Sequence, residues 1–176
     1  NVIHVNGRVD PIADIETIVT ELALADLAVV ERTLHRDSKK ARAGDKDAIK
    51  LVAVLERLLP HLNEGRPART MAGLSDDDKL LLKPLCLLTV KPAMYVGNVT
   101  EDGFENNPYV ERLQAHAKAE GAPVVVLCAK IESELADLDD EDKLAFLADL
   151  GLEEPGLNRL VRAAYELLGL QTYFTA

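Results

Sequence analysis

The sequence has few cysteines, no excess of basic residues and no long apolar run. Its 2 cysteines, Cys86 and Cys128, both lie in apolar segments, which predicts buried, reduced thiols and neither a disulfide nor a cysteine metal site. Acidic residues outnumber basic ones by 30 to 20, giving a net charge of −10, which excludes a uniformly basic nucleic-acid binder. No apolar run approaches the roughly 20 residues of a membrane span, and the N-terminal residues lack a signal-peptide pattern. These features predict a cytoplasmic protein with no membrane partner.

The sequence also offers no cluster of catalytic or metal-binding side chains. None of its 4 histidines stands four positions from another, the spacing that would place two imidazoles on one helix face. The acidic run Asp137–Asp142 fits a helix start, where carboxylates cap the backbone and complement the helix dipole. We therefore expect neither a metal ligand nor a catalytic residue in this chain.

Two long helical patterns occupy the first part of the chain. A first helix from Asp14 to about Ala43, about 45 Å long at about 1.5 Å per residue, is predicted by a three-and-four spacing of Ile15, Ile18, Leu22, Ala25 and Val29. A second is predicted by Ala48, Leu51, Leu55, Leu58 and Leu62. Gly65 and Pro67 stop it, and Pro60 should kink it or end its regular part. Together they predict an antiparallel helical hairpin.

Strands and helices alternate in the second part. After a short helix from Ser75 to Leu82, a buried strand is predicted within residues 87–96 and a second, parallel one over Pro123–Cys128. Helices are predicted at 107–120, 132–138, 140–150 and 155–168. Such an alternation with apolar strands is typical of an α/β fold with a parallel sheet.

Polar residues follow each predicted strand, where ligands bind in open parallel sheets. Asn98 and Glu101 come after the first strand, and Cys128, Ala129 and Lys130 come after the second. The spacing Asn-Val-Thr-Glu is similar to the Asn-Lys-x-Asp of Ras-like nucleotide triphosphatases, whose Asp accepts hydrogen bonds from guanine. Taken alone, Asn98 and Glu101 also fit ordinary turn and helix-capping residues, and Lys130 a solvated loop residue.

Longer blocks of sequence carry a closer resemblance. They are Ile3-His-Val-Asn-Gly-Arg-Val-Asp-Pro, Thr20-Glu-Leu-Ala-Leu-Ala-Asp-Leu, Asn98-Val-Thr-Glu-Asp-Gly-Phe-Glu-Asn-Asn-Pro and Phe146-Leu-Ala-Asp-Leu-Gly-Leu-Glu-Glu-Pro-Gly-Leu-Asn-Arg. With them the chain resembles the YchF family of Obg-related, ribosome-binding P-loop ATPases. The terminal Leu170-Gln-Thr-Tyr-Phe-Thr resembles the entry to that family's TGS domain.

The resemblance implies an α/β fold: a partial Ras-like parallel-sheet nucleotide domain with an inserted antiparallel α-helical hairpin. Residues 1–13 and 71–170 would belong to the nucleotide domain, 14–70 to the inserted hairpin, a coiled coil, and 171–176 to the start of a TGS-like domain. None of the ten glycines lies in a G-x-x-x-x-G-K-[S/T] phosphate loop. The chain is therefore expected to be inactive alone and to form part of an ATPase that also hydrolyses GTP, less well, with Mg²⁺ ligands outside this chain.

The resemblance also implies a role for the residues at the strand ends. Asn98 would hydrogen-bond the purine edge, Val99 would pack on the base, and Glu101 would set selectivity for adenine nucleotides. Cys128, Ala129 and Lys130 would contribute through their backbone amides.

Basic residues gather where the two predicted helices meet. Between Arg32 and Lys50 the net charge is +4, whereas the rest of the chain carries −14. Positive charge at the end of a long hairpin could reach phosphates away from the acidic body. We predict a contact with the ribosome or its RNA, and none with DNA, through Arg36, Lys39, Lys40, Arg42 and Lys46. Two alternatives stay open: the charges only solubilise the hairpin, or the chain is a non-catalytic module that binds RNA or protein through the hairpin.

Overall fold

A computed structural model describes residues 9–173. Within the chain there are two compact units, Asn1–Lys91 and Pro92–Ala176, which we call the hairpin unit and the sheet unit. Most of the predicted segment 1–13, and the last three residues of the predicted TGS entry, lie outside the described residues. None of the helices in residues 9–173 is long and apolar enough to span a membrane.

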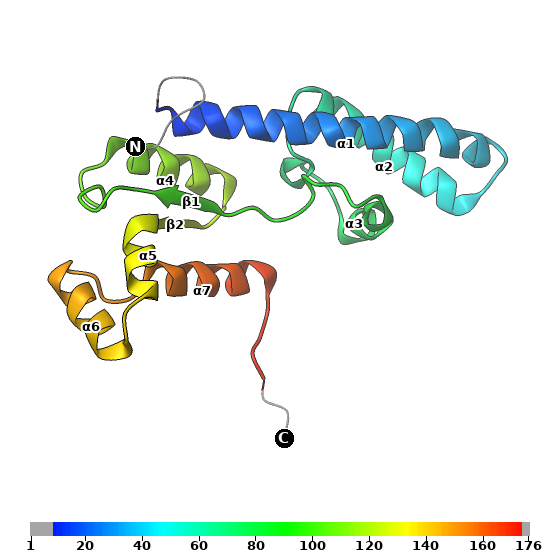
Figure 1. Ribbon diagram of the computed structural model, residues 1–176. Helices are drawn as coiled ribbons and strands as arrows, with labels where there is room; N and C mark the ends of the chain where they lie inside the picture. Colours follow the sequence, from blue (N-terminus) through cyan, green and yellow to red (C-terminus); the bar gives the residue numbers. More distant parts are fainter. Residues whose placement is uncertain (1–8, 174–176) are drawn as a thin grey trace. The chain divides into compact units, whose positions relative to one another are not determined.

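Over residues 9–91 the hairpin unit consists of three α-helices and two short 3-10 turns, and Figure 1 labels the helices. These elements are α1 (Pro11–Arg42), α2 (Lys46–Asn63), η1 (Ala68–Thr70), α3 (Asp76–Leu82) and η2 (Lys83–Leu85). The chain turns back between α1 and α2 within three residues, helped by Gly44, whose φ of +90° suits glycine. The Asp45 carboxylate then accepts hydrogen bonds from the amides of Asp47 and Ala48, capping α2. This turn places α2 along α1.

Helix α2 buries the side that the sequence predicts. Leu55, Leu58 and Leu62 are fully buried, and Ala48 is nearly so. Pro60 does not end the helix, which continues to Asn63. A proline less than one turn from the helix end removes only one hydrogen bond of the final turn.

The buried side of α1 differs from the prediction. Ile18 is 58% exposed and Leu22 is 37% exposed, so these two predicted contacts are wrong, although Val29 of the predicted side does pack against the core. The buried residues are instead Ala23, Asp26, Val30, Thr33 and Asp37. The three polar ones among them all have hydrogen-bond or ion-pair partners, which removes most of the cost of burying them.

Over residues 92–173 the sheet unit contains two parallel strands and four helices. They are β1 (Tyr95–Asn98), α4 (Pro108–Glu120), β2 (Val124–Leu127), α5 (Ala129–Ala136), α6 (Asp140–Asp149) and α7 (Gly156–Leu168). The predicted strand within 87–96 is displaced, because residues 87–90 form no strand and β1 begins only at Tyr95. Val96 on β1 is 46% exposed, so this strand is not fully buried.

The two cysteines are free thiols in different environments. Cys128 is buried as predicted, but Cys86 is exposed, which corrects the prediction for that residue. Cys86 follows η2 with a left-handed backbone, φ +51°. The chain reverses there, and the thiol stays at the surface.

Candidate nucleotide-base site

The carboxyl ends of β1 and β2 coincide. In the parallel register, Asn98 pairs with Leu127, and the amide of Val99 donates to the carbonyl of Leu127 at 2.9 Å. The segments that follow the two strands therefore leave the sheet at one edge, where parallel sheets bind ligands. All six predicted base-binding residues lie at this edge.

Asn98 joins the two segments. Its side-chain Oδ1 accepts a hydrogen bond from the amide of Ala129 at 2.9 Å. Helix α5 starts at Ala129, and its N-cap residue Cys128 makes no side-chain cap of its own. Asn98 thus satisfies an N-terminal amide of α5 across 31 residues of sequence. Its side chain positions the loop after β2.

Glu101 and Lys130 form an ion pair across the edge. The Lys130 ammonium donates to Glu101 Oε1 and lies 3.7 Å from Glu134. The hydrogen bond with Glu101, with the charges of both carboxylates, raises the pKa of Lys130 above its usual value. The side chains of Lys130 and Glu101 are 69% and 46% exposed, so the pair presents a cation and an anion to solvent together.

Cys128 and Ala129 contribute differently from their neighbours. Cys128 is 3% exposed and packs with Ile131, Leu135 and Leu147, so its thiol belongs to the core of the sheet unit. Ala129 is exposed and its amide is already engaged by Asn98. The sites open to a ligand at this edge are therefore mainly the side chains of Glu101 and Lys130.

One contact that supports this edge is absent from the sequence prediction. The carboxylate of Glu132, on α5, accepts hydrogen bonds from the amides of Gly156 and Leu157 at 2.7 and 3.1 Å. It thereby caps α7, whose N-cap Pro155 makes no side-chain hydrogen bond. No local motif signals a cap supplied by another helix 24 residues away.

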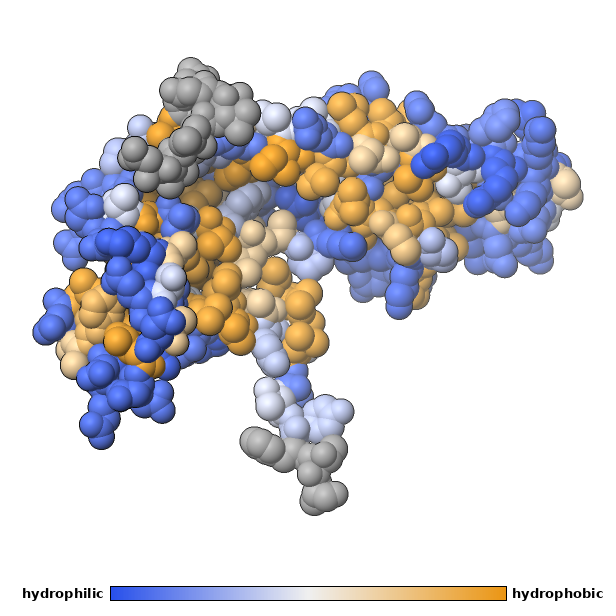
Figure 2. Space-filling view, in the orientation of Figure 1, coloured by the Kyte–Doolittle hydropathy of each residue, from blue (hydrophilic) through white to orange (hydrophobic). Residues whose placement is uncertain are grey.

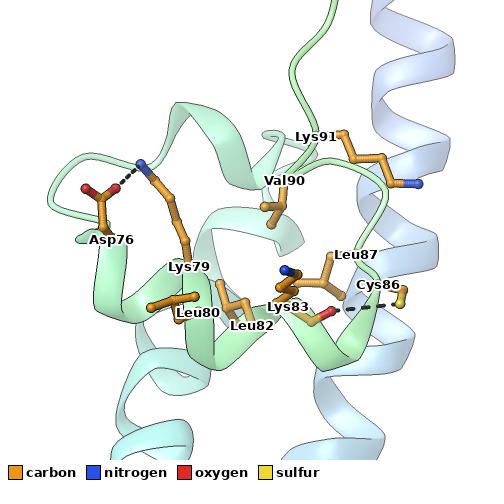
Figure 3. A pocket seen from close by; sticks show the side chains of 9 residues that line it. All are labelled: Asp76, Lys79, Leu80, Leu82, Lys83, Cys86, Leu87, Val90 and Lys91. Atoms are coloured by element: carbon orange, nitrogen blue, oxygen red, sulfur yellow. Dashed lines mark hydrogen bonds and ion pairs between the residues drawn. The ribbon is translucent and has the colours of Figure 1, made fainter. Parts of the chain in front are cut away.

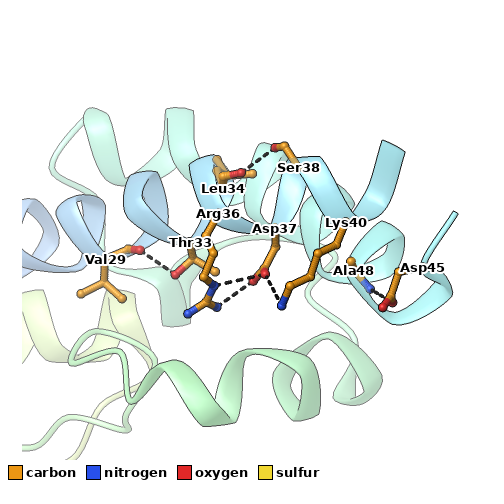
Figure 4. Close-up of polar contacts among 9 residues, drawn as sticks. All are labelled: Val29, Thr33, Leu34, Arg36, Asp37, Ser38, Lys40, Asp45 and Ala48. Carbon is orange, nitrogen blue, oxygen red and sulfur yellow. Dashed lines mark hydrogen bonds and ion pairs between the residues drawn. The ribbon is translucent and has the colours of Figure 1, made fainter. Parts of the chain in front are cut away.

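The predicted basic contact residues lie in the last two turns of α1 and at the start of α2, on either side of the turn between them. Figure 4 shows two of them, Arg36 and Lys40. Arg36 donates to both oxygens of the Asp37 carboxylate, at 3.1 and 2.7 Å, and Lys40 lies 3.2 Å from it. The hydrogen bond from Arg36 is the main cause that lowers the pKa of Asp37 to about 2. Two of the five predicted contact cations are thus partly neutralised.

The other three predicted contact cations are more available. In the part of the chain that the structure describes, Lys39, Arg42 and Lys46 have no carboxylate partner. All three are exposed, and hydrophilic residues cover this end of the hairpin (Figure 2). The local positive charge expected from the sequence is therefore accessible.

Comparison with known proteins identifies the class first. The structure superimposes on a solved structure of the YchF GTPase of Schizosaccharomyces pombe with a TM-score of 0.85 and 27% identity, covering 100% of this chain and 49% of that chain. The chain thus has the fold of a YchF GTPase over the part that it spans.

The sequence comparison then gives the family. The chain is 54% identical over 176 residues to the ribosome-binding ATPase YchF of Escherichia coli O157:H7, and 48% identical over 179 residues to that of Bacillus subtilis strain 168. It is therefore homologous to the YchF family over its whole length. It spans about half the length of these curated relatives, 48% and 49%. No protein-family model matches it.

Proposed function

We propose that this chain supplies the base-recognition edge and the helical hairpin of a ribosome-associated ATPase that hydrolyses ATP, and GTP less well. The observation that carries the proposal is the meeting of Asn98, Glu101 and Lys130 at one edge of a parallel sheet. Homology to proteins named ribosome-binding ATPases supports it. In this proposal residues 14–70 form an insertion in the nucleotide domain.

The phosphate chemistry is assigned to other parts of such a protein. Among residues 9–173 no three His, Cys, Asp or Glu side chains are grouped so that they could hold a metal ion. No step of the proposal runs through Mg²⁺ in this chain. The chain's own contribution is to bind and orient the base.

The Glu101–Lys130 pair suggests how adenine is preferred. Guanine presents two donors, from its ring nitrogen and its amine, which a free carboxylate would accept. Here the Glu101 carboxylate already accepts a hydrogen bond from the Lys130 ammonium. Adenine presents an amine donor beside a ring acceptor, which matches a carboxylate beside an ammonium. Val99, half-buried at the same edge, would pack on the base.

The preference for ATP should weaken when this pair is changed. We expect Val99→Lys with Glu101→Asp to move the affinity ratio toward GTP, because the shorter carboxylate withdraws from Lys130 and the new lysine stem can cover the base. Lys130→Met should also lower the preference, because it leaves an unpaired carboxylate facing the acceptor of adenine. The measurement is the Kd of ATP and GTP for a chimera that joins this chain to the part of the E. coli relative that it does not cover.

The matched control for this test is Ala119→Lys, which adds the same charge at an exposed position of α4. It should leave the ratio unchanged. An unchanged ratio in both the double variant and Lys130→Met would show that this edge does not select the base. The chain without the chimeric half is expected to show no ATP turnover.

The turn of the hairpin is proposed as the contact with ribosomal RNA. Its support is the net charge of +4 between Arg32 and Lys50, the three unpaired cations described above, and the names of the relatives. Phosphate contacts release counterions, so binding should depend steeply on salt. An RNA contact is consistent with the otherwise acidic chain because the charge is local.

Reversing Lys39, Lys40 and Arg42 to Glu should weaken binding to ribosomes or ribosomal RNA. The slope of log affinity against log salt should become shallower by about 0.7 to 0.9 for every phosphate that the variant no longer neutralises. All three residues are exposed, and circular dichroism checks the helix content because Lys40 also pairs with the buried Asp37. Filter binding or sedimentation over a salt series measures the slope.

A variant with the same charge change elsewhere serves as the control: Arg112, Lys118 and Lys143 to Glu, all in the sheet unit. If both triple variants weaken RNA binding equally, the effect comes from the net charge of the chain and not from a contact at the hairpin turn. Unchanged affinity and slope in the first variant would leave the basic turn a solubilising surface.

A further inference from the structure

An apolar groove of about 560 Å³ lies in the hairpin unit (Figure 3). Its apolar lining is formed by Leu80 and Leu82 of α3 and by Leu87 and Val90 of the segment that follows η2. Leu82 and Leu87 are almost fully buried, whereas Leu80 is 64% exposed. The groove therefore has a packed floor and an apolar side chain free at its edge.

The wall of the groove is held in place by a buried carboxylate. Asp26 of α1 is 2% exposed and accepts hydrogen bonds from the amides of Leu88 and Thr89, both at 2.7 Å, and from the Thr89 hydroxyl at 2.6 Å. These two residues lie between Leu87 and Val90, so the contacts fix the backbone that carries two lining side chains. A pre-ordered wall lowers the entropy cost of binding.

Three of the four charged residues that line the groove are lysines, and the fourth is Asp76. Lys79, Lys83 and Lys91 all line it. Lys79 is paired with Asp76 at 2.8 Å, whereas neither Lys83 nor Lys91 has a carboxylate partner within residues 9–173. In a chain of net charge −10, two unpaired ammonium groups beside an apolar floor complement an acidic, apolar ligand.

The lining favours a peptide as that ligand. Single-stranded RNA binds through bases stacked on aromatic or arginine side chains, and the residues that line the groove include neither. An amphipathic helix fits an open apolar groove through side chains at positions i, i+3, i+4 and i+7. We propose that this groove docks an acidic amphipathic helix of a partner protein, with leucine-type side chains on the floor and carboxylates at Lys83 and Lys91.

Cys86 provides a direct readout of occupancy. It lines the groove and is exposed, whereas Cys128 is buried. The probe is a synthetic helical peptide of Leu, Glu and Ala, with Leu at i, i+3, i+4 and i+7 and Glu beside them. A matched peptide carries Lys for every Glu. The rate of Cys86 alkylation by iodoacetamide, followed by mass spectrometry on the full chain, should fall at least about fivefold with the acidic peptide and stay unchanged with the basic one.

Variants then locate the binding surface. Leu80→Asp, and separately Lys83→Glu with Lys91→Glu, should each weaken the peptide Kd about tenfold, because one removes an apolar contact and the other replaces attraction by repulsion. Arg112→Glu with Lys118→Glu, at two exposed positions of α4, changes the net charge by the same amount as the double variant and should bind normally. Circular dichroism confirms folding, which does not depend on these exposed side chains.

Several results would overturn the proposal. These are no protection of Cys86 at about 1 mM acidic peptide, equal protection by the basic peptide, or undiminished binding in the groove variants. Protection by a single-stranded uridine oligonucleotide and not by the peptide would assign the groove to RNA. Protection that rises with protein concentration alone would assign it to a second copy of the chain.

Discussion

Asp26→Asn is expected to lower the free energy of unfolding of the hairpin unit by about 2 to 4 kcal/mol. The Asp26 carboxylate is an acceptor only, and its three hydrogen bonds with Leu88 and Thr89 all come from donors on those residues. Asn replaces one oxygen by an NH₂ group, which would face a donor at close range. Because Asp26 is 2% exposed, bulk solvent does not readily replace the lost partner.

The effect should spread through Thr89. The Thr89 hydroxyl also accepts a hydrogen bond from the amide of Ala68 at 2.9 Å, so weakening its hydrogen bond to Asp26 loosens η1 as well. Urea unfolding followed by circular dichroism measures the change. Glu31→Gln, at an exposed position of α1, is the matched control and should change stability by less than about 0.5 kcal/mol. Equal stability of Asp26→Asn and the control would contradict a structural role for the carboxylate.

Gly156→Ala is expected to destabilise the sheet unit by about 2 to 4 kcal/mol. A Cβ at Gly156 would lie 2.7 Å from Cβ of Leu127 and 2.8 Å from Oε1 of Glu132. The Leu127 atom is held by the β2 backbone and cannot rotate away. Relief would require α7 to move from β2, which breaks the cap that Glu132 gives to the Gly156 amide.

Replacing glycine by alanine within a helix normally stabilises the helix by up to about 1 kcal/mol. A decrease in the free energy of unfolding of Gly156→Ala would therefore show that the close contacts outweigh this gain. Asn158→Ala, exposed on the same helix, is the control and should stabilise slightly. Thermal unfolding compares the two. A Tm for Gly156→Ala at or above that of the unchanged chain would show that α7 accommodates the methyl group.

Local sequence signals predicted most helices because their cause is local. Ser75 and Asp78 form the capping box that begins α3, Asn107 and Pro108 begin α4, and Gly121 ends it in the left-handed conformation. Each signal acts through hydrogen bonds or backbone angles within one turn. The apolar side of α2 was predictable for the same reason, since its leucines recur at helical spacing.

The sequence by itself determined the helices, the parallel α/β pattern of the second part, the family resemblance and the local basic charge near the hairpin turn. The tertiary structure alone decided which side of α1 is buried, since Asp26 and Asp37 enter the interior only with partners, and Asp26 draws its partners from residues 62 and 63 positions away. It also decided that Lys130 meets Glu101 and that Glu132 caps α7. Contacts between distant segments depend on how strands and helices pack, and no local spacing of residues encodes them.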